Sequence, residues 1–473
     1  MLGQKQPRGF SVFFLTEMWE RYGFYVLQSL LVFYALEKIH LDDANAYLMV
    51  GSFTALAYVN SIFGGIIADR LIGYNKAILA GAFLLCLGYV ILTIASEVDM
   101  FIIGLAIVTV GTGMLKPNIS SMLSMLYRDN PKQKEVGYTL YYVGIYFGAI
   151  GGSFIGGYIK VYFGWVAVFI SAAIGLAIAF ATFYHGQKKY ALRDERNIRY
   201  SGKSHVIALF SIAFLIITAF FGIQNEEMST LLFSVIALAS LAFLLHNIKL
   251  HHGDERKKLI AFTILTVFSG LYWAVYFQQF FSVSLCTARV TNLTMPESSL
   301  TAFESLGVII FGPLVNGLWL WLQKKNRDVS ITAKFSLSFL FNSLSFLVLI
   351  LSLQYAMQHG MRQNQIFIII CYLLIAFGEL FISPIGLAMV STLVPQRLNG
   401  AMMGIFLMSI GLGGKLAGFL AQTSVSSSTA TLVELEQTYI HSFSIYSIFS
   451  VIIFICCVMA IRPINKLIQG TNQ

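Results

Sequence analysis

Long apolar runs, separated by short polar segments, repeat along the whole chain. A helix needs about 20 apolar residues to cross the roughly 30 Å hydrocarbon core of a bilayer, and each run is close to that length or longer. The runs occupy residues 10–37, 44–67, 76–96, 99–127, 136–160, 163–186, 205–222, 229–248, 258–284, 299–323, 331–357, 364–393, 398–422 and 438–462. They predict fourteen membrane-spanning helices in the order six, two, six.

This order predicts an all-α polytopic membrane protein in three parts. Residues 1–186 would form an N-terminal bundle of six helices, and residues 258–473 a C-terminal bundle of six. Residues 187–257 would form a cytoplasmic linker that carries the two inserted helices. The first run contains charged residues and is longer than the core of a cleavable signal peptide, so we expect it to remain as the first membrane helix.

The composition excludes the soluble and disordered classes of protein. Hydrophobic residues make up 57% of the chain and charged residues 11%, whereas about a quarter of an ordinary soluble domain is charged. The five cysteines and eight histidines show no spacing typical of metal ligands or of a disulfide framework. We therefore expect no metal site, no catalytic residues and no enzymatic activity.

The distribution of basic residues predicts how the chain is oriented in the membrane. If both termini are cytoplasmic, 24 of the 31 lysines and arginines lie on the cytoplasmic side and four on the outer side. Cytoplasmic loops are enriched in these residues, so the bias supports an even number of spans. It also accounts for the net charge of +9 without a nucleic-acid partner. The basic run from Lys188 to Lys203 is then a solvated cytoplasmic loop.

Five of the ionisable residues inside predicted spans are candidates for a functional site, because charge is costly there. Each costs about 2.5–3.5 kcal/mol at the centre of a membrane helix, so these residues must face one another or a water-filled cavity. Glu17, Glu20 and Arg21 share one face of the first helix with Tyr25, because the spacing i, i+3, i+4, i+8 follows the helical repeat. The other two are Lys116 and Glu379.

These charges favour a carrier for a small zwitterion. Three acids and two bases leave one carboxylate without a basic partner. A cavity of low dielectric constant favours the neutral form of this carboxyl group, so one glutamate would bind a proton. Arg21 and Lys116 would attract a carboxylate, and Glu379, in the other bundle, an ammonium group. A channel is disfavoured, because it would need rings of like charge.

Glycines at four-residue spacing predict close contacts between helices. The fifth predicted span carries Gly144, Gly148, Gly152 and Gly156. A stripe of small residues lets another backbone approach closely. Static packing and a sliding interface explain this stripe equally well.

Several strings around the charged residues resemble the signatures of one family. Residues 17–25 (EMWERYGFY) are similar to the ExxERFxYY signature of the proton-dependent oligopeptide transporter family, part of the major facilitator superfamily. Residues 64–73 (GGIIADRLIG) resemble the superfamily's loop motif between helices 2 and 3. Strings similar to those of the family also stand at residues 111–118, 378–386 and 402–418.

The resemblance implies two six-helix bundles of the major facilitator fold, alternating access, and symport of di- or tripeptides with protons. It implies proton coupling by Glu17, Glu20 and Arg21, with Arg21 and Lys116 near the peptide carboxylate and Glu379 at its amino group. The substrate site would comprise Arg21, Tyr25, Tyr58, Lys116, Tyr146, Gln278, Glu379, Ser383 and Phe406. We expect a monomer in a bacterial inner membrane, with the proton as coupling ion and no cofactor.

The chain departs from the family pattern at several positions that would line the cavity. Tyr146 replaces an expected asparagine, Phe24 the first of two tyrosines, and Phe406 a tryptophan. The charged residues are kept while the lining is exchanged, so the cavity would be smaller or differently shaped. The alternative is therefore a proton-coupled transporter of the same fold for a non-peptide zwitterion or carboxylate. A sensor of this fold that binds without transport is a further alternative.

Two departures concern the proton. Phe277 stands where many members of the family carry an acid, so coupling would depend more heavily on Glu17 and Glu20. Residues 303–307 (FESLG) replace a string close to FQSxNP, and Gly307 is a further departure from the family pattern. Glu304 in that string is either a displaced acid or a solvated helix cap.

Overall fold

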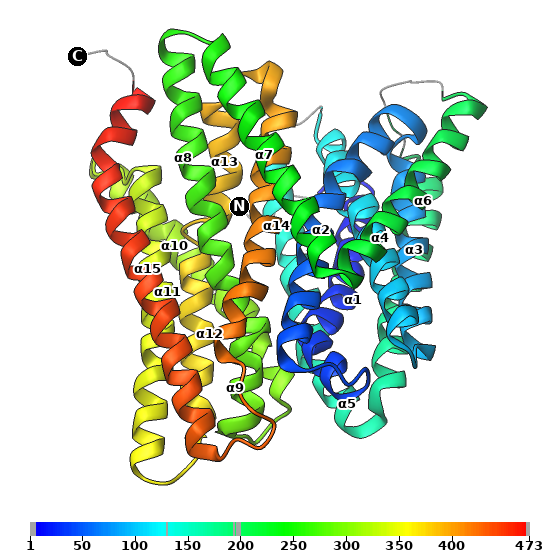
Figure 1. Cartoon of the computed structure of the whole chain (residues 1–473). Coiled ribbons are helices and arrows are strands. Elements are labelled where there is room, and N and C mark those ends of the chain that lie inside the picture. Colours follow the sequence, from blue (N-terminus) through cyan, green and yellow to red (C-terminus); the bar gives the residue numbers. More distant parts are fainter. Residues whose placement is uncertain (1–5, 129–130, 193, 195–199, 470–473) are drawn as a thin grey trace. The chain divides into compact units, whose positions relative to one another are not determined.

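The computed structural model describes residues 6–128, 131–192, 194 and 200–469, and part of the predicted basic loop lies outside them. The α-helices (Figure 1) are α1 (Phe10–Glu37), α2 (Asp43–Ile67), α3 (Tyr74–Ile94), α4 (Val98–Leu126), α5 (Pro131–Lys189), α6 (Gly202–Gln224), α7 (Glu226–Leu250), α8 (Gly253–Tyr276), α9 (Ser282–Val290), α10 (Ala302–Lys324), α11 (Ile331–Gln358), α12 (Gln365–Glu379), α13 (Ser383–Leu393), α14 (Asn399–Ala421) and α15 (Leu432–Gln469).

Short elements connect some of these helices. They are the π-helix η1 (Ala68–Ile72) and the 3₁₀-helices η2 (Phe277–Phe280), η3 (Glu297–Thr301), η4 (Gln396–Leu398) and η5 (Gln422–Ser424). The strands β1 (Thr291–Asn292) and β2 (Gln363–Asn364) pair in parallel, with Thr291 opposite Gln363. No strand was predicted from the sequence.

The all-α membrane fold class is confirmed. Twelve segments of the described chain are long and apolar enough to cross a membrane. One of them, Val136–Lys189, has a break at Gly164, where φ is 78° and ψ is −179°, so it contains two of the predicted spans. The charged residues of α1 make it less apolar than those twelve, yet its 28 residues are long enough to span. The described helices are therefore consistent with the six-two-six order.

Two of the predicted spans are not continuous helices. The span predicted over residues 364–393 is divided into α12 and α13. Pro384 lies in the first turn of α13, and a proline has no N–H to donate to the preceding turn and its ring excludes the carbonyl there. The span predicted over residues 258–284 is regular only to the end of α8 and continues through η2 into α9.

The chain forms two compact units. The first unit contains Met1–Leu41 and Ser52–Ser229, and the second contains Asp42–Gly51 and Thr230–Gln473. Within the first unit α1 packs along α5 and α3 along α4, whereas within the second α11 packs along α15 and α8 along α14. The inserted pair is divided, because α6 belongs to the first unit and most of α7 to the second. The predicted linker over residues 187–257 stays a prediction.

The glycine stripe of α5 lies against α1. A Cβ atom at Gly148 would be 2.2 Å from the carbonyl oxygen of Met18 on α1, and one at Gly152 would be 2.4 Å from that of Tyr22, one helical turn later. No side chain fits at these distances, so only glycine permits this approach of the two backbones. In the second unit, a Cβ atom at Gly418 of α14 would be 2.8 Å from the carbonyl oxygen of Tyr47. The glycine stripe of α5 thus holds α1, the helix that carries Glu17, Glu20 and Arg21, close to α5.

Candidate functional site

Three charged side chains of α1 form a buried group in the first unit. Arg21 donates through Nη2 to Glu20 Oε1 at 2.6 Å, and its Nε contacts the other carboxylate oxygen of Glu20. The same Nε lies 3.6 Å from Glu17 Oε1. The three residues are at most 3% exposed. The structure thus brings together the residues that the helical spacing placed on one face.

Neighbouring side chains enclose this group. The Arg21 guanidinium carbon lies 4.7 Å from the ring centre of Phe24, so the residue that replaces an expected tyrosine still contacts the charge through its ring face. Tyr141 of α5 is buried beside Glu17. At Gly148, the position of a Cβ atom would be 2.9 Å from the Cβ of Arg21. Tyr141 was not predicted as a site residue, because its sequence position does not show that it faces α1.

The predicted residues on α2 and α4 also meet in the first unit. Lys116 Nζ lies 5.2 Å from the ring centre of Tyr58, and a cation over an aromatic face is attracted by the ring. The charge of Lys116 also acts on Glu17. Tyr25 and Tyr146, like Lys116 and Tyr58, are half-buried. This part of the first unit therefore presents cations and phenol groups together.

A pair of carboxyl groups forms the corresponding group in the second unit. The hydroxyl of Tyr276 on α8 lies 3.1 Å from Glu379 Oε2 and 3.2 Å from Glu304 Oε1. Ser305 donates to the other oxygen of Glu304 at 2.9 Å. Glu304 is 1% exposed and Glu379 is 7% exposed. Ser383, at the start of α13, is half-buried within hydrogen-bonding reach of Glu379.

The burial of Glu304 decides between the two readings of this residue. It lies in the first turn of α10, where a solvated cap would be expected to reach water. Its carboxylate instead faces α8 and α12. The prediction of a solvated helix cap is therefore wrong, and the prediction of a displaced acid is the one that remains. Tyr276 was not predicted as a site residue. Its position four residues after Tyr272, on the same helix face, was the available signal.

Gln278 and Phe406 have packing contacts in this structure. Gln278 is fully buried, donates to the carbonyl oxygen of Ala417 at 2.9 Å and accepts from Ser282 at 2.9 Å. It thereby holds η2, which follows α8, against α14. Phe406 of α14 packs on α13, because a Cβ atom at Gly386 would be 2.3 Å from its ring. A role of either residue in substrate binding stays a prediction.

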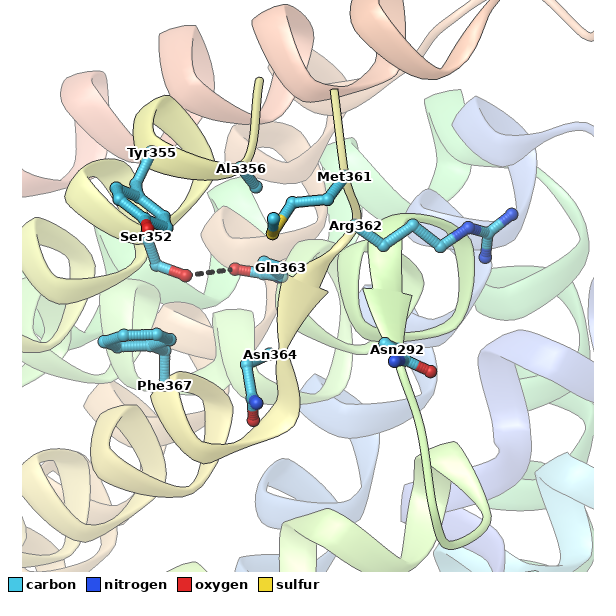
Figure 2. A pocket seen from close by; sticks show the side chains of 9 residues that line it. All are labelled: Asn292, Ser352, Tyr355, Ala356, Met361, Arg362, Gln363, Asn364 and Phe367. Carbon is cyan, nitrogen blue, oxygen red and sulfur yellow. Dashed lines mark hydrogen bonds between the residues drawn. The ribbon is translucent and has the colours of Figure 1, made fainter. Parts of the chain in front are cut away.

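A separate cavity lies beside the strand pair of the second unit. Its volume is about 380 Å³, and its lining (Figure 2) consists of Asn292, Ser352, Tyr355, Ala356, Met361, Arg362, Gln363, Asn364 and Phe367. Ser352 donates to Gln363 across one wall at 3.1 Å. None of the predicted site residues lines this cavity, so we assign it no part in the site.

Known proteins similar to this chain belong to one family, and the similarity extends over most of the chain. The family model described as the POT family matches residues 75–440. The chain is 29% identical to dipeptide and tripeptide permease A of Chromobacterium violaceum over 90% of this chain and 87% of the relative. It is 28% identical to dipeptide and tripeptide permease A of Escherichia coli K12, over 88% of this chain and 85% of the relative.

Solved structures share the fold. A crystal structure of tetrameric PepTSo2 has a TM-score of 0.86 at 22% identity, covering 97% of this chain and 99% of that chain. A structure from work on substrate recognition in proton dependent oligopeptide transporters has a TM-score of 0.85 at 25% identity, with the same coverage. These likenesses confirm the major facilitator fold. Together with the match of the family model over more than half of the sequence, they lead to one conclusion: this chain belongs to the POT family.

Proposed function

We propose that this protein is a proton-coupled symporter of di- and tripeptides that works by alternating access. The observation that carries the proposal is the buried group of Glu17, Glu20 and Arg21, which retains the family's charged signature inside a membrane helix. An ionic group in this position is costly, so its retention points to a function. The relatives named dipeptide and tripeptide permease support the same cargo.

Each charged group has a role in this proposal. Arg21 and Lys116 bind the carboxylate of the peptide, because both present a basic group beside an aromatic ring. Glu379 binds the amino group of the peptide. Glu17 and Glu20 take up the coupling proton, since two acids share one arginine and leave a surplus carboxylate. Tyr25 and Tyr146 contribute phenol groups to the substrate site.

The remaining expectations belong to the same proposal. The protein lies in a bacterial inner membrane with both termini in the cytoplasm, acts as a monomer, uses no cofactor and catalyses no reaction. The bias of basic residues supports the orientation. Tetrameric assembly is described for one structural relative, so the oligomeric state needs its own measurement. The exchanged lining, above all the bulk of Tyr146, favours a non-peptide zwitterion or carboxylate as the second candidate cargo.

Uptake by purified protein in proteoliposomes tests the proposal. An inward proton gradient is imposed, accumulation of labelled di- and tripeptides is followed, and the gradient is then collapsed with an ionophore. We expect gradient-dependent accumulation that is lost in Lys116→Ala and in Glu379→Ala. No uptake of any peptide, while a known peptide permease is active in parallel, would contradict it. Uptake of amino-acid derivatives alone would instead support the second candidate.

A further inference from the structure

The hydroxyl of Tyr276 lies between the carboxyl groups of Glu304 and Glu379 and has one proton for the two of them. The Tyr276 oxygen is 3.1 Å from an oxygen of Glu379 and 3.2 Å from an oxygen of Glu304, so both distances are those of hydrogen bonds. A phenol has a single proton and can donate to only one of them. The two carboxyl groups also lie within hydrogen-bonding reach of each other.

Both contacts are satisfied only when one carboxyl group is protonated. The protonated group then donates to the Tyr276 oxygen, which donates its own proton to the other carboxylate. With both groups ionised, one of the two contacts would join two oxygens with no hydrogen between them, although Glu304 is 1% and Glu379 7% exposed. We propose that Glu304 and Glu379 share one proton through Tyr276, and that Glu304 is the proton carrier of the second unit.

A second observation supports a proton site here. Tyr272, one helical turn before Tyr276, is fully buried, and its hydroxyl has no hydrogen-bond partner. This hydroxyl lies 3.5 Å from the position that a Cβ atom would take at Gly378, next to Glu379, and it is exposed to the charge of both carboxyl groups. It is therefore placed to replace Tyr276 as hydrogen-bond partner when the pair rearranges.

The side chains around the pair are phenols and hydroxyls. The titratable groups that face it are Tyr272 and Tyr276 of α8 and Tyr372 of α12. Hydroxyls come from Ser305 of α10 and Ser383 of α13. The contacts described for the two carboxyl groups include no lysine or arginine, so a proton or a ligand cation must balance their charge.

This charge balance assigns different tasks to the two acids, and this step rests on the proposed function. Two carboxylates carry two negative charges, and symport brings two positive charges to the second unit: a proton in addition to the one taken up by Glu17 and Glu20, and the peptide ammonium. The ammonium pairs with Glu379, and the proton stays on Glu304. No bond other than the O–H bond forms or breaks: the proton enters from one side of the membrane and leaves to the other. An acid on α10 thereby replaces the acid that is absent at Phe277.

Glu304→Gln separates proton transfer from substrate binding. The amide keeps the shape of the side chain and cannot carry a proton. In proteoliposomes we expect this variant to keep counterflow exchange of labelled peptide within about two-fold of the wild type. Its gradient-driven accumulation should drop to the level seen with ionophore, and pyranine fluorescence should show at least one proton fewer per peptide. Glu304→Asp should restore accumulation in part.

The matched control is Glu436→Gln on α15, which neutralises another buried glutamate of the same unit outside the pair. Its accumulation should equal that of the wild type. Full accumulation by Glu304→Gln would overturn the inference while leaving peptide symport intact. Absence of both counterflow and accumulation in the wild type would instead refute the proposed function.

A spectroscopic measurement covers the case in which Glu304→Gln does not fold. Tyr276→Phe keeps the ring and removes only the hydroxyl between the two acids. Infrared difference spectra of the purified wild type, recorded between alkaline and acidic pH, should contain a carbonyl band of a buried protonated carboxyl group. This band should shift in Tyr276→Phe, and not in the Glu436→Gln control. A band that is unchanged in Tyr276→Phe would overturn the shared proton.

Discussion

At the scale of single residues, Glu20 is the buried acid most directly tied to Arg21. Both of its oxygens contact the guanidinium, at 2.6 Å for the Nη2 contact. Glu20→Gln keeps an oxygen that can accept from Arg21 but removes the group that can carry a proton. We expect gradient-driven accumulation to be lost, while exchange of peptide across the membrane without a gradient persists. Paired uptake and counterflow measurements check this.

A control on the same helix separates coupling from a general effect of charge. Glu37 lies at the end of α1, is 47% exposed through its side chain and pairs with Lys160 at 2.8 Å. An exposed ion pair contributes about 0–1 kcal/mol, so Glu37→Gln should transport like the wild type. Accumulation by Glu20→Gln at the wild-type level would show that coupling does not depend on this residue.

Tyr146 is the residue at which the cargo can be tested. It is half-buried on α5, two positions before Gly148, in place of an expected asparagine. Tyr146→Asn removes a ring and adds an amide that hydrogen-bonds peptide groups. We expect its relative uptake of a panel of di- and tripeptides to change by about ten-fold for at least some members, the effect of one hydrogen bond of about 1.4 kcal/mol. An unchanged profile would mean that Tyr146 does not contact the cargo.

The charged residues of α1 were predictable because their grouping follows from the helical repeat alone. Glu17, Glu20 and Arg21 lie on one face of any helix that contains them, and their cost in a membrane requires partners. Glu304 was not predictable in the same way. Its burial depends on a tyrosine 28 positions earlier and a glutamate 75 positions later, and no local pattern connects these elements.

At the scale of elements, the contact of α1 with α5 depends on the size of one residue. A Cβ atom at Gly148 would be 2.2 Å from a backbone oxygen and 2.9 Å from the Cβ of Arg21. Gly148→Ala should therefore push the helices apart, shift the charged group and destabilise the protein by about 1–3 kcal/mol, the usual cost of overpacking. Thermal unfolding of the detergent-solubilised protein and peptide uptake both measure this.

Gly151 provides the matched control for that substitution. It lies on the same helix, and its Cβ atom would be 3.5 Å from the ring of Tyr22, an ordinary van der Waals distance. Gly151→Ala should leave the unfolding temperature close to that of the wild type or slightly above it, because alanine favours helix over glycine. Equal destabilisation by the two substitutions would mean that helix propensity or lipid contact, and not the α1–α5 contact, is responsible.

The positions of most helices were predicted to within a few residues, although α15 extends six residues before and seven residues beyond its predicted run. The breaks inside the helices were not predicted. Apolar length determines where a chain crosses a membrane, so each predicted run has a counterpart among the described helices. Gly164 turns α5 through a positive φ, which the sequence shows only as one glycine among many. Pro384 gave a clear signal for the break between α12 and α13, whereas the change from α8 to η2 at Phe277 contains neither proline nor glycine.

At the scale of the whole molecule, the number of crossings determines the side on which each loop lies. The chain belongs to the POT family and forms two compact units. The helices α6 and α7 add two membrane crossings only if both of them span the membrane. Both are long and apolar, and only 22% and 17% of their most apolar windows are buried inside the protein, so most of their apolar surface is left exposed. Such surfaces are stable in a bilayer and unstable in water.

Reporter fusions test this count. Alkaline phosphatase is active outside the cytoplasm, and green fluorescent protein fluoresces inside it. We expect truncation after Asn225, between α6 and α7, to give an active phosphatase fusion, because seven spans bring that loop to the outer side. Truncation after His251 and fusion at the C-terminus should give fluorescent fusions, since eight and fourteen spans return the chain to the cytoplasm. An inactive phosphatase at Asn225, with fluorescence there, would show that α6 and α7 do not cross the membrane and that only twelve helices do.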